Sequence, residues 1–288
     1  MRIIDALLWG EQELKTAQVE NPRWDADLLL GHILHQRREQ LYLERERLLK
    51  AEELDLYQDF IKRRSQREPL QYIVKHQEFM GLDFYVDERV LIPRADSEVL
   101  IERVLEYRKS WSTKIELQGL GPQEVGPRIV DLCTGSGALA ISIAHYWPEA
   151  QVTGTDISSD ALQVAQYNSQ NLGVNIFWRQ GDFLEPIRGE TWDIIISNPP
   201  YIGRDEYPIL SPEVKKEPAI ALLAEEDGLA FYHKLALEAR SLLNPQGCIF
   251  LEIGWQQGEK VSGFFREQGF QVDIYQDYGN RDRVLWVR

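Results

Sequence analysis

The sequence predicts an α/β protein whose open, doubly wound sheet is mostly parallel and is preceded by a small helical domain. Three observations support this prediction. Residues 1–69 carry apolar side chains at helical spacing. From residue 128 onward, short apolar runs of strand length alternate with amphipathic segments of helix length. The last two apolar runs are joined by a short link, 277–282, which requires them to pair antiparallel near one edge of the sheet.

The composition limits the classes of function. The chain has 288 residues, enough for one large domain or two. Its 32 Lys and Arg against 46 Asp and Glu give a formal net charge of −14. This charge argues against tight binding to DNA or RNA, because such binding depends on cationic side chains. No Cys/His spacing matches a metal site, and no apolar run approaches the ~18 residues of a membrane span. The two cysteines, Cys133 and Cys248, allow at most one disulfide, so a reducing cytoplasm is the expected setting.

The first domain is predicted to span residues 1–69. Apolar stripes at helical spacing run through 3–14, 24–34 and 54–61, and Asn21-Pro22 is a typical start for the second of these helices. A helical bundle with a purely structural role and a docking module for a macromolecular partner are both consistent with this pattern.

The periodicity changes after Pro69, and residues 70–95 are predicted to form a β-hairpin linker. Short strands are expected at 71–74 and 82–86, with Met80-Gly81 as the turn between them.

The remaining residues, 96–288, are predicted to form the α/β domain. A helix is expected from Asp96 or Ser97 to about residue 107, followed over 110–127 by a loop or weakly ordered insertion rich in Gly and Pro. The strands expected after it are 129–133, 151–157, 175–180, 193–197, 247–253, 270–275 and 283–287. The helices expected between them are 138–146, 159–172, 228–243 and 257–268.

A glycine-containing turn follows the first strand of this domain. The strand end and turn comprise Asp131, Leu132, Cys133, Thr134, Gly135, Ser136 and Gly137. Glycines let a ligand approach the backbone, and the helix that follows offers free N–H groups. The third glycine of a dinucleotide fingerprint is absent, since position 140 is Ala140, so a nucleoside with a tail other than a pyrophosphate is expected.

Acidic residues end the next two strands. Asp156 is placed to accept hydrogen bonds from ribose hydroxyls, although it could instead cap the helix that begins near Ser158. Asp182 beside the aromatic Phe183 suits the exocyclic amine and the ring face of an adenine. Together with Asp131, these acids favour a cofactor that carries positive charge, such as a sulfonium, over a polyphosphate.

The fourth strand leads into a loop formed by Asn198, Pro199, Pro200 and Tyr201. The two prolines make this loop rigid. An amide beside a flat aromatic ring suits a planar guest that carries NH2 donors. The alternative is a proline-rich turn in which Tyr201 serves only for packing.

These motifs resemble those of S-adenosylmethionine-dependent methyltransferases that modify planar nitrogens, and most closely the HemK/PrmC family of release-factor glutamine methyltransferases. Further matches to that family are Pro69-Leu70-Gln71-Tyr72-Ile73, Phe79-Met80-Gly81-Leu82, Leu91-Ile92-Pro93-Arg94, Glu217-Pro218-Ala219, Asp227-Gly228-Leu229 and Leu251-Glu252-Ile253-Gly254. The chain departs from the family at Cys133, where glycine is common, at Ala95-Asp96-Ser97, which replaces a more usual Pro-Asp/Glu-Thr, and at Glu225, a position that is often glycine.

The resemblance implies a Rossmann-like class I methyltransferase domain, S-adenosyl-L-methionine as the cofactor, and the glutamine of the Gly-Gly-Gln motif of peptide chain release factors as the target. It implies cofactor contacts for Asp131, Cys133, Thr134, Gly135, Ser136, Gly137, Asp156, Asp182, Phe183 and Asn198. It implies substrate contacts for Arg94, Asn198, Pro199, Pro200 and Tyr201. The helical first domain would then grip the release factor, and a monomer is expected.

The chemistry of an amide acceptor agrees with this assignment. The Asn198 side-chain oxygen and the Pro199 carbonyl can each accept one N–H of a substrate amide, which localises the nitrogen lone pair toward the methyl donor. Tyr201 would pack on the amide plane, and these three residues are the predicted catalytic set. An adenine-N6 methyltransferase acting on nucleic acid and a non-catalytic S-adenosylmethionine-binding adaptor are the competing interpretations, and the net charge disfavours the first.

Overall fold

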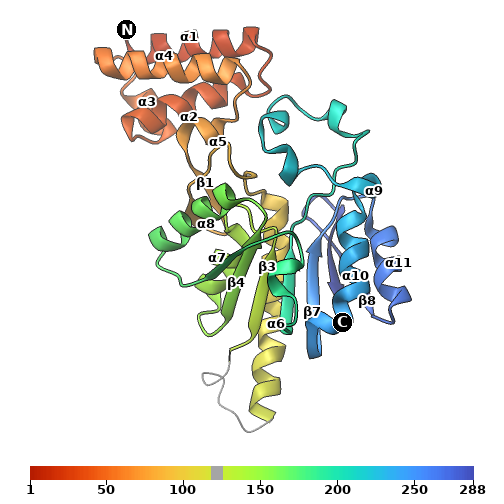
Figure 1. Cartoon of the computed structure of the whole chain (residues 1–288). Coiled ribbons are helices and arrows are strands. Elements are labelled where there is room, and N and C mark those ends of the chain that lie inside the picture. Colours follow the sequence, from red (N-terminus) through yellow and green to blue (C-terminus); the bar gives the residue numbers. More distant parts are fainter. Residues whose placement is uncertain (118–125) are drawn as a thin grey trace. The chain divides into compact units, whose positions relative to one another are not determined.

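The computed structural model describes residues 1–117 and 126–288, which divide into two compact units (Figure 1). The first unit contains residues 1–76 and the short segment 211–216. The second contains 77–210 and 217–288. Among the residues that the structure describes, no helix is long and apolar enough to cross a membrane.

The first unit is helical, as its apolar periodicity predicts. Its helices are α1 (Ile3–Thr16), α2 (Pro22–Leu34), α3 (Arg38–Leu43), α4 (Ala51–Ser65) and α5 (Leu70–Val74). Pro22 occupies the first position of α2, where its missing N–H has no partner to lose. Ile3, Leu14, Leu29 and Tyr57 are buried in one shared core.

The strand expected at 71–74 is wrong, because these residues belong to helix α5. Ile73 is buried in the helical core, and Leu70 and Val74 pack against the same core. Their i, i+3, i+4 spacing is helical, but a run of five residues is too short for that period to be distinguished from a strand. Lys75 ends the helix in the left-handed conformation, at φ 56°.

A buried ion-pair cluster attaches the segment 211–216 to the helical bundle. Arg64, at the end of α4, contacts Asp25 at 2.7 Å and Glu213 at 2.9 Å, and Arg67 contacts Glu213 at 2.7 Å. Burial raises the pKa of Asp25 even though Arg64 opposes the rise. Burial would also raise the pKa of Glu213, but the hydrogen bonds from Arg67 and Arg64 outweigh it and lower that pKa.

Replacing Arg64 by alanine is expected to destabilise the helical unit by about 3–5 kcal/mol, because Asp25 would remain buried without its cation. Unfolding in urea, followed by circular dichroism, measures this change. Arg2→Ala is the matched control, since Arg2 is about half exposed and pairs with Asp5 at the surface, and its loss should leave the midpoint almost unchanged. An Arg64→Ala variant with the wild-type midpoint would contradict the assignment.

A seven-stranded sheet forms the centre of the second unit. Its strands are β3 (Arg128–Leu132), β4 (Gln151–Asp156), β5 (Phe177–Gln180), β6 (Trp192–Ser197), β7 (Leu243–Glu252), β8 (Val272–Gln276) and β9 (Asp282–Val287). The order across the sheet is β5-β4-β3-β6-β7-β9-β8, and β9 is antiparallel to both of its neighbours. The predicted fold, a mostly parallel sheet with one reversed strand near its edge, is confirmed.

Helices cover both faces of this sheet (Figure 1). They are α6 (Glu98–Leu117), α7 (Ala138–Tyr146), α8 (Ser159–Asn171), α10 (Ala230–Leu242) and α11 (Gly258–Glu267), and the single turn α9 (Glu225–Gly228) precedes α10. Ile194 and Ile196 of β6 lie in a core with residues of α6 and α7, whereas Ile195 lies in a second core with residues of α10 and α11. The alternation explains why the strand reads as a continuous apolar run.

Helix α6 is longer than the sequence predicts. It continues to Leu117, so the loop expected at 110–127 is wrong over residues 110–117. Val104, Tyr107 and Trp111 extend the apolar stripe at helical spacing, and all three pack against the sheet. Of the rest of that expected loop, residues 118–125 lie outside the described residues.

A hairpin with the predicted turn and second strand is present in the second unit, but its first strand is β1 (Gln77–Phe79) and not 71–74; the second strand is β2 (Leu82–Phe84). Met80 and Gly81 form its turn with positive φ angles, as a two-residue hairpin turn requires. Single 3-10 turns complete the structure at η1 (Ala95–Ser97), η2 (Glu185–Ile187), η3 (Tyr207–Ile209), η4 (Val214–Lys216) and η5 (Ala219–Ala221).

Candidate active site

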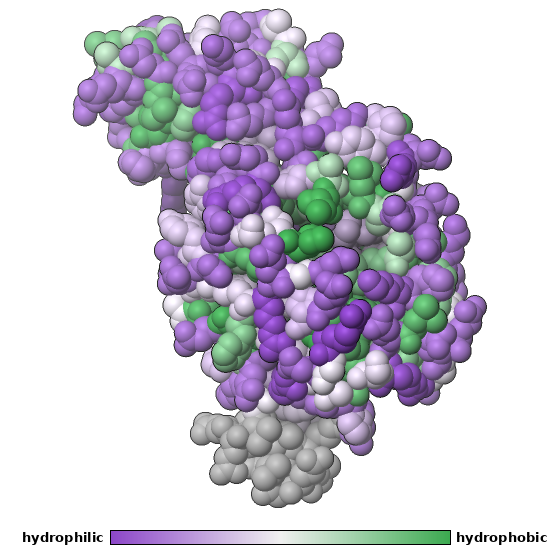
Figure 2. Space-filling view, viewed as in Figure 1, coloured by the Kyte–Doolittle hydropathy of each residue, from purple (hydrophilic) through white to green (hydrophobic). Residues whose placement is uncertain are grey.

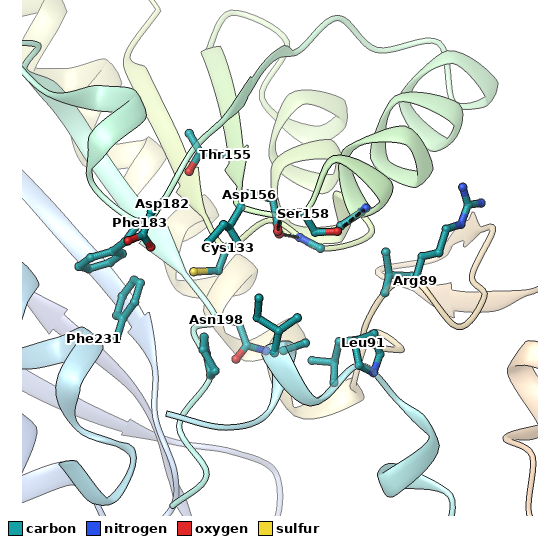
Figure 3. Close-up of a pocket in the computed structure, with 18 of the residues that line it drawn as sticks. Arg89, Leu91, Cys133, Thr155, Asp156, Ser158, Asp182, Phe183, Asn198 and Phe231 are labelled. Carbon is teal, nitrogen blue, oxygen red and sulfur yellow. Dashed lines mark hydrogen bonds between the residues drawn. The ribbon is translucent and has the colours of Figure 1, made fainter. Parts of the chain in front are cut away.

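A cavity of about 240 Å³ opens at the carboxyl ends of β3, β4, β5 and β6 (Figure 3). The chain runs outward from β3 through β4 to β5 and then returns to β6, so the cavity lies at the switch point where an open α/β sheet binds its ligand. Its lining includes Cys133, Gly135, Thr155, Asp156, Asp182, Phe183, Asn198, Pro200 and Phe231. Figure 2 shows a mostly hydrophilic surface on which strongly apolar side chains gather near these strand ends.

Asp131 lies beneath the glycine turn and not on the cavity wall. Its side chain is fully buried and accepts hydrogen bonds from Thr134 Oγ1 at 2.6 Å and from the Ala140 backbone N–H at 3.2 Å. Burial raises the pKa of Asp131 to about 7, although these two hydrogen bonds oppose the rise. These bonds give Asp131 a role in shaping the turn, and its direct contact with a cofactor stays a prediction.

The other residues of the glycine turn line different cavities. Cys133 and Gly135 line the main cavity, whereas Thr134 and Ser136 line a smaller adjoining cavity of about 50 Å³. Gly137 precedes α7 at φ 82°, and a Cβ there would lie 2.9 Å from an Ile141 methyl group. Gly137 thus permits close packing of the helix and is not among the residues that line either cavity.

Gly135 leaves space for a ligand at the turn. It has φ 56°, and a Cβ built on it would meet no protein atom within 4 Å. Gly135→Ala is therefore expected to place a methyl group in the ligand space and to weaken cofactor binding by roughly 10–100-fold, the effect of about 1–3 kcal/mol of overpacking.

Isothermal titration with S-adenosylmethionine measures the effect of Gly135→Ala. Gly173→Ala is the matched control, because Gly173 has a similar φ of 67° and open surroundings but does not line the cavity. It should carry the same backbone strain with unchanged affinity. Equal affinities for the two variants would show that Gly135 does not face the cofactor.

Asp156 is held at the end of β4 by the backbone. Its carboxylate accepts N–H groups from Gly135 and Ser158, each at 2.9 Å, and burial raises its pKa. The helix cap itself is Ser158, whose hydroxyl accepts from Ala161 N at 3.1 Å. Since each carboxylate oxygen has more than one lone pair, Asp156 can also accept from hydroxyl groups in the cavity.

An aromatic pair closes one end of the cavity. The Phe183 and Phe231 ring centroids lie 3.8 Å apart, and Asp182 stands next to them (Figure 3). Phe231 comes from α10, nearly fifty positions further along the chain. Its place in the site was not predicted, because an aromatic residue on a helix reads as ordinary core.

Asn198 lies on the wall shared by both cavities. Its Nδ2 donates to Ser97 Oγ at 3.2 Å, which leaves the side-chain Oδ1 as the atom able to accept a hydrogen bond from a guest. Pro199 is buried and Pro200 lines the main cavity. The loop thus places the predicted acceptor, the Asn198 side-chain oxygen, on the same cavity wall as the glycine turn at Gly135.

Tyr201 is not among the residues that line the main cavity, and packing of its ring on a substrate amide stays a prediction. Its ring packs against the core shared with α10 and α11, and its hydroxyl lies 3.4 Å from Glu252 Oε1. Its carbonyl oxygen accepts from Gln257 Nε2 at 3.0 Å, and Gln257 Oε1 accepts from Gly254 N at 2.9 Å. These contacts fix the position of the Asn198 loop. Gln257 was not among the predicted site residues.

Arg94 pairs with the buried carboxylate of Glu217, which also accepts the Ile92 backbone N–H at 3.1 Å. This pairing joins the segment before α6 to the segment after the Asn198 loop. Arg94 does not line the main cavity, but the neighbours of the pair, Leu91 and Pro218, do.

Comparison with known proteins agrees with this site. Residues 5–74 match the PrmC N-terminal domain family, and residues 112–211 match the methyltransferase small domain family. The chain is 40% identical to the release factor glutamine methyltransferase of Clostridium acetobutylicum, covering 99% of this chain and 98% of that protein. It is 42% identical to the protein of the same name from Moorella thermoacetica, over 99% and 98% of the two chains.

The fold also has solved counterparts. A methyltransferase from Pyrococcus furiosus matches with a TM-score of 0.50 at 20% identity, covering 75% of this chain and 92% of that chain. At this identity the match concerns the fold alone. The similarity to the two release factor glutamine methyltransferases is much higher, at 40% and 42% identity over nearly the full chain. It shows that the chain belongs to the family of release factor glutamine methyltransferases.

Proposed function

We propose that the protein transfers a methyl group from S-adenosylmethionine to the side-chain amide nitrogen of the glutamine in the Gly-Gly-Gln motif of peptide chain release factors. The observation that carries this proposal is the position of Asn198 on the wall of the cofactor cavity, with its NH2 group turned toward Ser97. An acceptor oxygen at this place suits a guest that brings N–H donors. The family membership supplies the class of guest.

The residues present fit the cofactor. Gly135 leaves open space at the turn, Asp156 can accept from ribose hydroxyls, and Phe183 with Asp182 suits an adenine. When bound, S-adenosylmethionine supplies an electrophilic methyl group on a positively charged sulfonium. The acidic side chains around the cavity favour that charge, and Asp131 supports the turn from beneath.

On the substrate side, Asn198 Oδ1 and the Pro199 carbonyl each accept one N–H of the glutamine amide. These bonds concentrate the lone pair on the nitrogen and stabilise the positive charge that develops there. Pro200 forms part of the wall, Tyr201 fixes the loop through its hydroxyl and its carbonyl, and Arg94 shapes the neighbouring segment through Glu217. Holding the amide in line with the methyl donor is the main contribution to rate.

We further propose that the helical unit, with residues 1–69 as its predicted extent, grips the release factor, and that residues 70–95 link it to the catalytic domain, 96–288. In this account the enzyme acts as a monomer in the cytoplasm and has no nucleic-acid or membrane partner. The net charge of −14 supports a protein acceptor over a nucleic acid.

An acceptor competition tests this function. The protein is incubated with methyl-labelled S-adenosylmethionine, a purified release factor and duplex DNA, and the label in each acceptor is counted. We expect label in the release factor alone. Label in the DNA would favour an adenine methyltransferase, and label in neither, with the cofactor bound, would favour a non-catalytic adaptor.

A further inference from the structure

A buried carboxyl group lies beneath the Asn198 loop. Glu252, at the end of β7, is 1% exposed, and its Oε1 lies 3.4 Å from the Tyr201 hydroxyl. Within the described residues its Oε2 has no hydrogen-bond partner. An unpaired buried carboxyl oxygen is unfavourable, so a nearby donor would bind to it readily.

The Ser97 hydroxyl can supply such a donor, because its side chain is 3% exposed and it lowers the pKa of the Glu252 carboxyl. Ser97 also accepts the Asn198 side-chain N–H at 3.2 Å. A hydroxyl has one hydrogen to donate and two lone pairs with which to accept. When its hydrogen points to Glu252, the Ser97 oxygen can only accept from Asn198.

This relay decides which way the Asn198 amide faces. An amide can rotate by half a turn, which exchanges its oxygen and its NH2 group at almost no steric cost. A carboxylate at Glu252 only accepts, so it orients Ser97 as a donor and keeps the Asn198 NH2 turned inward. A protonated Glu252 can donate to Ser97 instead, which frees the Ser97 hydrogen for the Asn198 oxygen and turns the NH2 group toward the substrate.

We infer that Glu252, acting through Ser97, is a positioning residue that sets the orientation of the Asn198 amide and so controls whether the site can accept a glutamine N–H. This inference rests on the proposed function for its consequence in catalysis. The orientation itself is a property of the protein alone.

The surroundings of Glu252 place its ionisation near neutral pH. The groups that face it are Asp96 and Ser97 of η1, Tyr201 in the loop, Tyr232 of α10 and Arg283 of β9. Burial raises the pKa of Glu252 to about 7, against the opposing effects of Ser97 and Arg283. Arg283 is shared with Asp277 at 3.1 Å and Asp96 at 3.4 Å, which limits its influence on Glu252. Below about pH 7 the carboxyl is protonated, and above it the inward orientation of the Asn198 NH2 is fixed.

The side-chain amide of Asn198 can be followed directly by ¹⁵N NMR, without substrate. In the wild-type protein its signal should shift with a midpoint near pH 7. Glu252→Gln and Ser97→Ala should each remove that titration. A wild-type signal that does not titrate, or one that still titrates in Glu252→Gln, would overturn the inference, whatever acceptor the enzyme uses.

Turnover provides the second measurement. The wild-type kcat should rise as the pH increases through about 7, whereas Glu252→Gln should lower kcat about 10–100-fold, remove this rise and leave cofactor affinity unchanged. The double variant Glu252→Gln with Ser97→Ala should have a kcat only slightly below that of Glu252→Gln, since both residues act on one relay. Tyr232→Phe is the matched structural control, because the Tyr232 hydroxyl donates to the backbone oxygen of Glu252 at 2.8 Å and not to the carboxyl. It should retain the pH-dependent rise, and a loss of the rise in this variant would indicate a merely structural effect.

Discussion

Replacing Asn198 by alanine is expected to lower methyl transfer to the release factor by about 10³-fold or more while S-adenosylmethionine binding stays largely intact. The variant loses the side-chain oxygen that accepts a substrate N–H, and with it both the alignment of the amide and the stabilisation of its developing charge. Single-turnover transfer of a labelled methyl group measures the rate, and calorimetry measures the cofactor affinity.

The control for this variant is Asn175→Ala, because Asn175 is exposed and is not among the residues that line the cavity. Its rate should match that of the wild type. A fully active Asn198→Ala enzyme would remove the central residue of the proposed mechanism, whereas loss of cofactor affinity in that variant would point to a structural defect in the turn.

Replacing Asp156 by alanine is expected to weaken S-adenosylmethionine binding by about 10²-fold, since hydrogen bonds to a charged group contribute about 1.5–3 kcal/mol. The carboxylate also holds Gly135 N and Ser158 N, so its loss loosens the turn. Because burial raises the Asp156 pKa, affinity should also fall as the pH is lowered into the acidic range, where the carboxylate becomes protonated.

Calorimetry of Asp156→Ala and Asp156→Asn across that pH range checks this prediction. The asparagine variant should lose the pH dependence, because its side chain does not titrate. Asp160→Ala, in the exposed first turn of α8, is the control and should bind like the wild type. Unchanged affinity in Asp156→Ala would assign the ribose contacts to another residue.

The alternation of strands and helices could be predicted because strands buried on both faces read as apolar runs, and Ile194, Ile195 and Ile196 illustrate this. The site could be predicted for a related reason. The carboxyl ends of parallel strands meet at one edge of the sheet, so Asp156 and Asn198, more than forty residues apart, line one cavity.

The remaining features depend on contacts that local periodicity does not encode. Phe231 reaches the cavity from α10, and Glu217 joins two distant loops through Arg94. The ion pairs of Glu213 with Arg64 and Arg67 give no signal in the sequence, since charged residues normally indicate a solvated surface. Prediction of short elements from the sequence fails for another reason. A helix of about one turn, such as α5, contains less than two periods of the apolar pattern, so its period cannot be identified.

Locating the methyl group by tandem mass spectrometry tests the central claim most directly. A purified release factor is incubated with the protein and S-adenosylmethionine, digested and sequenced by fragmentation. The account predicts a single added methyl group on the side chain of the glutamine in the Gly-Gly-Gln motif, absent when Asn198→Ala replaces the wild-type enzyme. A methyl group on any other residue would contradict it. So would a release factor that stays unmodified while the same wild-type enzyme methylates another acceptor.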